Sequence, residues 1–260
     1  MIIIGTSGYH FPDWSGAFYP PDLPKEQWLR YYAERFPAVE INMTYYALPK
    51  PEQVARWAQE VPEGFRFTVK LPGETTHKRE RDGEEVSEFL PLLAPLRDRG
   101  MLVGVLGQFP ASFHNEQGER DYLELVVERC GDVPLFVELR HISWDRDDTI
   151  EWLSRLGAHW VTVDQPALRG LSRPRPAATG GVGYVRFHGR NRKTWYNPKA
   201  GDRYDWDYEE EELKSWIPRL KAMEERAETS YLFFNNCHAG QAVRSAKLMK
   251  AMLAGELKVV

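Results

Sequence analysis

The sequence of 260 residues contains little cysteine, no long apolar run and no large excess of charge. Its two cysteines, Cys130 and Cys237, are too few for a disulfide framework, so we expect a cytoplasmic protein with reduced thiols. No stretch of about 18 apolar residues predicts a transmembrane helix, and the first residues lack the pattern of a signal peptide. The net charge of −4 argues against a protein whose whole surface binds nucleic acid or an anionic membrane.

Eight short apolar segments, several of them rich in β-branched residues, alternate with segments of helical periodicity. Near-continuous apolar runs are typical of parallel strands that are covered on both faces. We expect these strands at residues 2–6, 38–42, 65–70, 101–106, 135–139, 160–164, 183–187 and 231–235. Eight strands that alternate with helices in a chain of roughly 250 residues favour a single (β/α)8 TIM barrel over residues 1–260, rather than a doubly wound sheet.

Proline and glycine predict two irregularities in this barrel. Pro91 and Pro95 fall inside the third helical segment, where each removes a backbone donor, so this helix is expected to kink or split. Residues 165–181, which follow the sixth strand, are rich in proline and glycine. We expect an irregular excursion there in place of a full sixth helix.

Polar and charged residues lie at the carboxyl ends of the expected strands, where TIM barrels carry their functional groups. These residues are Glu40, Asn42, Lys70, Gln108, Glu138, Arg140, Asp164, Arg186, His188, Asn235 and Asn236. An isolated buried charge costs several kcal/mol, so these side chains predict either an internal lattice of ion pairs or a wet cavity. Because they converge from several different strands, a cavity at the barrel mouth is the favoured interpretation.

Short motifs spread over nearly the whole chain carry a family resemblance. They are residues 5–9 (GTSGY), 14–20 (WSGAFYP), 40–46 (EINMTYY), 65–70 (FRFTVK), 76–77 (TH), 108–110 (QFP), 138–140 (ELR), 143–144 (SW), 186–189 (RFHG), 234–236 (FNN) and 240–242 (GQA). In this order they resemble the DUF72 (YecE-like) proteins, although Tyr9 stands where many members carry Trp. The resemblance implies a TIM barrel of unassigned function, with a structural likeness to endonuclease IV and xylose isomerase-like barrels.

A metal-dependent hydrolase or isomerase is one hypothesis for the strand ends, because carboxylates and an imidazole can hold a divalent ion. The ligands would be Glu40, Glu138, Asp164 and His188. However, the cations Lys70, Arg140 and Arg186 end on the same side of the barrel, where they would repel a divalent ion and pair with the carboxylates. No spacing typical of a metal site supports the hypothesis, so we expect no metal and no other cofactor.

The interpretation that we favour is a cavity that binds a phosphorylated or other anionic small molecule without a metal. Charged donors, hydroxyls and amides at the strand ends and in the following loops would hold such a ligand. The candidate binding residues are Ser7, Asn42, Lys70, His77, Gln108, Arg140, Asp164, Arg186, Asn235 and Asn236. If the protein is an enzyme, Glu40 or Glu138 is the candidate general base, provided that desolvation raises its pKa, and His188 is the candidate acid. The sequence does not decide whether it is an enzyme.

A nucleic-acid-binding surface is the alternative from a different class of protein. Residues 186–203 contain six Lys or Arg, Lys199 among them, against one Asp, which gives a local charge of +5. The candidate contacts are Arg190, Arg192, Lys193, Trp195 and Tyr196, because aromatic rings between basic side chains can stack on bases. We rank the cavity first, since the net charge is negative and its donors come from several strands. A thiol nucleophile at Cys237 is a weaker alternative, since a lone cysteine more often serves packing.

Overall fold

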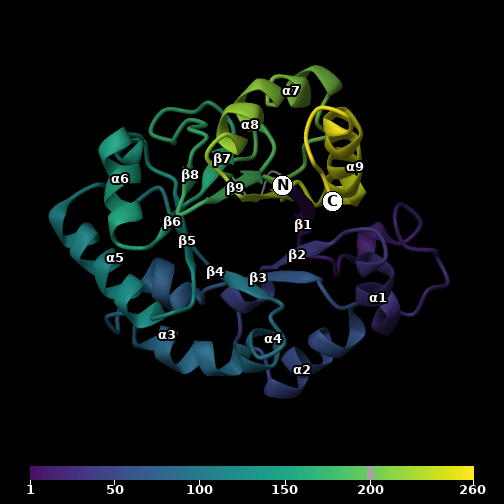
Figure 1. Cartoon of the computed structure of the whole chain (residues 1–260), viewed down its shortest axis with the longest axis horizontal. Helices are drawn as coiled ribbons and strands as arrows, with labels where there is room; N and C mark the ends of the chain where they lie inside the picture. The colour runs from purple at the N-terminus through teal and green to yellow at the C-terminus, as the bar shows by residue number, and fades with distance from the viewer. Residues whose placement is uncertain (198–201) are drawn as a thin grey trace.

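Parallel strands form a barrel with the helices outside it in the structure, a computed structural model that describes residues 1–197 and 202–260 (Figure 1). The barrel strands are β1 (Ile2–Ser7), β2 (Ala38–Ile41), β3 (Arg66–Lys70), β4 (Leu102–Phe109), β5 (Leu135–Leu139), β6 (His159–Trp160), β7 (Thr162–Asp164), β9 (Val182–Phe187) and β10 (Thr229–Phe234). They pair in the order β6–β5–β4–β3–β2–β1–β10–β9–β7. Only Val161 separates β6 from β7, so together they occupy the sixth position and nearly close the barrel. The TIM barrel and its eight strands, predicted from the sequence, are confirmed.

Helices surround the strands on the outside of the barrel (Figure 1). They are α1 (Trp28–Ala33), α2 (Pro51–Glu60), α3 (Glu84–Phe89), α4 (Ala94–Arg97), α5 (Gln117–Cys130), α6 (Asp147–Arg155), α7 (Glu210–Lys214), α8 (Ile217–Glu224) and α9 (Gln241–Leu253). Among the described residues, no helix is both long and apolar enough to cross a membrane.

Both predicted irregularities are present. The third helical segment is divided, because a 3-10 turn (Leu90–Leu93) that contains Pro91 separates α3 from α4, and Pro95 lies in the first turn of α4. Residues 165–181, all of them described, contain no helix. Their one regular element is the short strand β8 (Ala178–Thr179), which pairs antiparallel with β9. The sixth helix of the barrel is therefore missing, as the proline and glycine content predicts.

Side chains inside the barrel change from apolar to charged along the strands. Towards the amino ends of the strands, the interior is filled by an apolar cluster that includes Phe136 on β5 and Tyr184 on β9. Because successive side chains of a strand point to opposite faces, the next inward residues along these strands are Glu138 and Arg186. The same step on β2 leads from the buried Ala38 to Glu40. The apolar layer therefore forms the base on which the charged layer at the carboxyl ends rests.

The close approach of β1 and β2 at Gly5 gives a test of this packing. A Cβ added at Gly5 would lie 2.2 Å from the carbonyl oxygen of Ala38 and 3.0 Å from the ring of Phe233. We expect Gly5→Ala to lower the free energy of unfolding by about 1–3 kcal/mol, as overpacking does elsewhere. Urea unfolding measures it, with Gly118→Ala on α5 as the control, because a Cβ there meets nothing within 4 Å. Equal stability of the two variants would contradict the register of β1 against β2.

Candidate functional site

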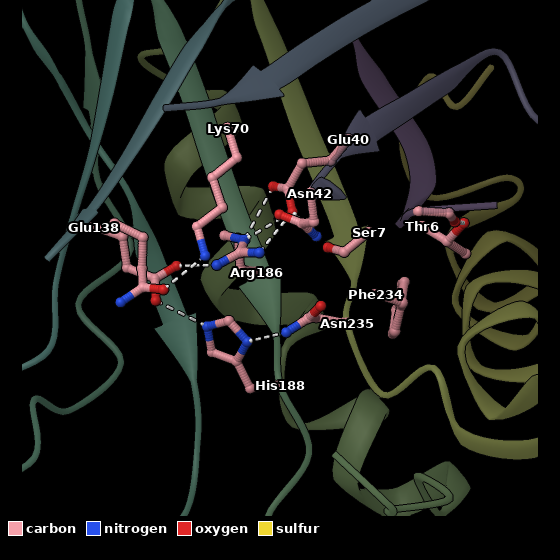
Figure 2. A network of polar contacts seen from close by, with 12 residues as sticks. Thr6, Ser7, Glu40, Asn42, Lys70, Glu138, Arg186, His188, Phe234 and Asn235 are labelled. Carbon is pink, nitrogen blue, oxygen red and sulfur yellow. Dashed lines mark hydrogen bonds and ion pairs between the residues drawn. The ribbon is translucent and has the colours of Figure 1, made fainter. Parts of the chain in front are cut away.

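Arg186 lies inside the barrel between two carboxylates that come from different strands (Figure 2). Its Nη2 donates to Oε1 of Glu40 at 2.6 Å, and its Nε donates to both oxygens of the same carboxylate at 2.9 and 3.1 Å. Its Nη1 donates to Oε2 of Glu138 at 2.6 Å. All three side chains are essentially inaccessible to solvent. The guanidinium therefore connects β2, β5 and β9 across the interior of the barrel.

The two carboxylates are ionised at neutral pH. Burial by itself would raise the pKa of each, but the charge of Arg186 outweighs it, so the pKa of Glu40 is lowered and that of Glu138 lies well below 4.5. Glu40 also accepts hydrogen bonds from the Tyr184 hydroxyl at 2.7 Å and from Nδ2 of Asn42 at 3.1 Å. The premise that desolvation raises a carboxylate pKa to that of a general base is therefore wrong for Glu40 and Glu138. Their oxygens hold Arg186 in place.

Arg140 and His188 extend this network from Glu138. Nε of Arg140 donates to Oε1 of Glu138 at 2.7 Å, and its guanidinium lies 5.5 Å from the ring centroid of Trp195. Nδ1 of His188 lies 2.9 Å from Nδ2 of Asn235, and its Nε2 lies 3.1 Å from Oε1 of Glu138 and 3.2 Å from Nη2 of Arg140. Burial lowers the pKa of His188 to about 4, so the ring is neutral at pH 7. It does not carry the extra proton that a general acid would need.

Lys70, at the end of β3, is the cation of this cluster for which the described part of the chain provides no carboxylate partner. Nζ donates to Oε1 of Gln108 at 2.9 Å and lies 4.4 Å from the ring centroid of Tyr45. Among the described residues, no carboxylate oxygen lies within 4.0 Å of Nζ. Burial lowers the pKa of Lys70 to about 7, and the neighbouring charges of Arg186 and Arg140 contribute to the decrease. When Lys70 is protonated, three cations thus face the two carboxylates of Glu40 and Glu138.

His77 lies beside this lysine on the turn after β3, in a short π-helix (Glu74–Lys78). Its Nδ1 is 2.9 Å from the hydroxyl of Thr76, and its ring packs edge-on against Tyr45, with centroids 4.9 Å apart. Burial lowers the pKa of His77 to about 4, and the charges of Lys70 and Arg140 lower it further. His77 is therefore a neutral neighbour of Lys70 at pH 7.

A cavity of about 600 Å³ opens at the carboxyl ends of the strands, above the charged cluster. The polar residues that line it include Ser7, Asn42, Lys70, Arg186 and Asn235. Its aromatic wall consists of Tyr9, Tyr45, Tyr46 and Tyr204, which the sequence-based prediction of the site missed. For Tyr9, Tyr45 and Tyr46, the signal that could have found them is the aromatic content of the segments at the ends of the first two strands, GTSGY and NMTYY.

Two buried polar atoms in this cavity have no hydrogen-bond partner among the described residues. They are Oγ of Ser7 and Oδ1 of Asn42, and solvent reaches neither atom in this structure. The Ser7 hydroxyl also contributes to the lowered pKa of Glu40. At the rim, Arg56 and Asp202 add one charge of each sign. Ser7, Asn42 and Lys70 therefore line the same cavity.

Asp164 and Asn236 do not face the cavity, although the sequence-based prediction placed them there. Asp164 accepts hydrogen bonds from Arg190, Tyr208 and Trp216 at 2.6–2.9 Å, outside the barrel strands. Asn236 donates to the Trp206 carbonyl and to the Ser245 hydroxyl on α9. The alternation of strand side chains explains both errors, because the inward residue is Val163 in one case and Asn235 in the other.

The ligand set of the metal hypothesis is therefore not brought together, since Asp164 lies apart from Glu40, Glu138 and His188. Within residues 1–197 and 202–260, no cluster of three or more His, Cys, Asp or Glu side chains is arranged to hold a metal ion. Cys237 also lines the cavity, but burial raises the pKa of its thiol well above the ordinary value. The thiol would be protonated at neutral pH, which argues against the nucleophile hypothesis.

The basic segment after β9 is divided between the interior and the surface. Arg190 pairs with Asp164 and with Glu212, and Trp195 is 2% exposed. Arg192, Lys193 and Tyr196 are exposed, whereas Lys199 lies outside the described residues. The structure therefore places Trp195 in the barrel mouth beside Arg140, and leaves Tyr196 as an exposed ring of this segment.

Fold and site together define a class: a TIM barrel whose mouth carries a buried ion-pair network beneath a polar and aromatic cavity. The model of one protein family, described as "Protein of unknown function DUF72", matches residues 3–260. The chain belongs to this DUF72 family, which confirms the resemblance that its motifs carry.

Curated relatives and solved structures agree with this assignment. The UPF0759 protein YunF of Bacillus subtilis is 30% identical over 97% of this chain and 95% of its own length. The UPF0759 protein YecE of Escherichia coli O157:H7 is 34% identical over 68% of this chain and 62% of its own length. The crystal structure of a DUF72 family protein from Thermotoga maritima matches with a TM-score of 0.89 and 39% identity, over 98% of this chain and 99% of that one.

The dependence of Glu40 on Arg186 gives a prediction for stability. Arg186→Met leaves the buried Glu40 without its cation, and breaking a buried pair in this way costs about 3–5 kcal/mol. In the wild type the folded pKa of Glu40 is lowered, so its contribution is complete above pH 4.5 and is lost as the pH falls below that value. In the variant, burial without the cation raises this pKa, so the loss of stability should be smaller at about pH 5 than at about pH 7.

Urea unfolding of both proteins at the two pH values measures this difference. The matched control is the double variant Glu40→Gln/Arg186→Met, in which no unpaired carboxylate remains at this position. We expect it to recover part of the stability at pH 7 and to lose the inverted pH dependence. A loss in Arg186→Met that is independent of pH would show that the pairing with Glu40 is not its cause.

Proposed function

We propose that the barrel mouth binds a small anionic molecule, a phosphate or carboxylate compound, without a metal. The observation that carries the proposal is the charge count of the buried cluster, in which Lys70, Arg140 and Arg186 face only Glu40 and Glu138. Both arginines have a carboxylate partner, whereas Lys70 has a neutral amide. An anion in the cavity would give Lys70 the charge-assisted partner that the described residues do not provide.

The cavity supports an organic ligand with an anionic group. Its volume of about 600 Å³ is well above the volume of a phosphate ion and within the range of small-molecule sites. The polar residues Ser7 and Asn42 line the cavity together with Lys70, and the aromatic side chains of Tyr45 and Tyr204 offer apolar contact. We therefore expect a ligand that combines one anionic group with a polar or planar body.

Titration calorimetry with glycerol 3-phosphate, with inorganic phosphate for comparison, tests this proposal. A hydrogen bond to a charged group contributes about 1.5–3 kcal/mol, so Lys70→Met should weaken binding by a factor of about 10 to 100. Because the protonated amine holds the anion and its pKa is about 7, affinity should fall as the pH rises from about 7.5 to about 9, where the phosphate of the ligand is already doubly ionised.

Two controls accompany this experiment. Lys70→Arg keeps the positive charge and should lose less affinity than Lys70→Met, and a chelator should leave the wild-type affinity unchanged. Equal affinities of the wild type and Lys70→Met for glycerol 3-phosphate would contradict the proposal. A stoichiometric divalent ion, found by elemental analysis of the purified protein, would favour the metal-dependent hydrolase or isomerase instead.

Exposure of the basic segment favours nucleic-acid binding as the second candidate function, because Arg192, Lys193 and Tyr196 all reach solvent. The affinity for an oligonucleotide whose phosphates contact several Lys and Arg side chains falls steeply as the salt concentration rises. The affinity for a small anion in the cavity depends on salt only weakly. We expect Arg192→Ala/Lys193→Ala to weaken any oligonucleotide binding uniformly across sequences and to leave glycerol 3-phosphate binding unchanged. Submicromolar oligonucleotide binding at physiological salt that this double variant abolishes would reverse our ranking of the two functions.

A further inference from the structure

We propose that Lys70 is an amine nucleophile that forms an imine with the carbonyl group of an anionic aldehyde or ketone bound in the cavity. The inference rests on the proposed function, and it narrows the class of ligand from anionic molecules in general to anionic carbonyl compounds. It assigns a covalent step to the barrel mouth, and the reacting atom is Nζ of Lys70.

The position of Nζ is the first argument. Lys70 lines the cavity, and the hydrogen bond of Nζ to Gln108 occupies one of its three donor positions. Some exposed lysines elsewhere on the chain are held in ion pairs, such as Lys78 with Glu74 at 3.1 Å and Lys214 with Glu211 at 2.9 Å. Because no described carboxylate lies within 4.0 Å of Nζ, no ion pair has to break before the amine reacts.

The charges around Nζ are the second argument. The titratable groups that influence or contact it are Arg186 on β9, Arg140 and Glu138 at the end of β5, Glu40 on β2, Tyr45 after β2 and His77 after β3. Burial and the two guanidinium groups together bring the pKa of Lys70 to about 7. About half of the amine is then neutral at pH 7, against less than about 0.1% for a lysine with the ordinary pKa of about 10.4. A lysine that is desolvated beside other cations is a recognised form of activated nucleophile.

The step balances without an oxidant or a reductant. The ammonium group loses a proton to water in the cavity, and its lone pair then attacks the carbonyl carbon. The carbonyl oxygen becomes the hydroxyl of a carbinolamine, takes up a proton and leaves as water while the C=N bond forms. One ammonium and one carbonyl therefore give one protonated imine and one water. The positive charge that is lost with the first proton returns when the protonated imine forms, so the anionic group of the ligand has a cation beside it before and after the step.

Reductive trapping tests the inference with two matched pairs of probes. Dihydroxyacetone phosphate and pyruvate carry a carbonyl group, and glycerol 3-phosphate and lactate carry an alcohol in its place. The full-length protein is incubated with each probe and sodium cyanoborohydride near pH 7, and intact mass with peptide mapping locates the adduct. We expect one adduct on Lys70 with at least one carbonyl probe and none with the alcohols.

Variants and a pH profile separate this chemistry from ordinary lysine labelling. Lys70→Arg should remove the adduct, whereas Lys78→Arg, which changes an exposed lysine on the neighbouring turn, should label as the wild type does. The rate of labelling at Lys70 should rise through about pH 7 and then level off, while other lysines continue to gain reactivity towards their ordinary pKa of about 10.4. A merely structural role of Lys70 would produce neither the adduct nor this profile.

Two outcomes overturn the inference in distinguishable ways. If the wild type binds glycerol 3-phosphate but neither carbonyl probe marks Lys70 above the exposed lysines, the imine is wrong and the anion-binding function stands. If the wild type binds none of the four probes and no adduct forms on Lys70, the proposed function fails and the inference fails with it.

Discussion

The ion pairs of Arg186 are the interaction on which the barrel mouth depends. They join β2, β5 and β9 across the interior, where neither carboxylate is exposed to solvent. Glu138, fixed in this way, holds Arg140 and His188, and Arg140 in turn packs against Trp195. The barrel tolerates these charges in its interior only because each has a close partner. The arrangement above the apolar layer therefore follows from one guanidinium on one strand.

The same burial has opposite consequences for the carboxylates and for Lys70. Glu40 and Glu138 lie against a guanidinium, and its charge holds their pKa low in spite of desolvation. Lys70 lies near the same guanidinium without an adjacent carboxylate, so desolvation and repulsion both lower its pKa. Pairing with Arg186 thus keeps Glu40 and Glu138 ionised. Lys70, which faces the cavity without such a pair among the described residues, can gain or lose a proton near neutral pH.

The fold could be predicted from the sequence because its signals are local: eight apolar runs, helical periodicity and the prolines that break it. The site could be predicted only in part. Near-continuous apolar strands hide which side chains point inward, so Asp164 and Asn236 were assigned to the wrong face. The pKa of Glu40 was misjudged for another reason, since it is set by Arg186, which is 146 positions away along the chain. Such a partner is known only once the barrel is closed.

The positions of arginine and lysine in the cluster match the different chemistry of the two side chains. An arginine is charged at any physiological pH and presents a planar fork of donors, which suits Arg140 and Arg186 for buried pairs with carboxylates. A lysine has one compact charge that desolvation can remove, and Lys70 stands where the cluster meets the cavity. An arginine at this position would hold an anion permanently but could not release a proton to become a nucleophile. The division between arginine inside and lysine at the cavity therefore fits a site that both binds an anion and reacts with it.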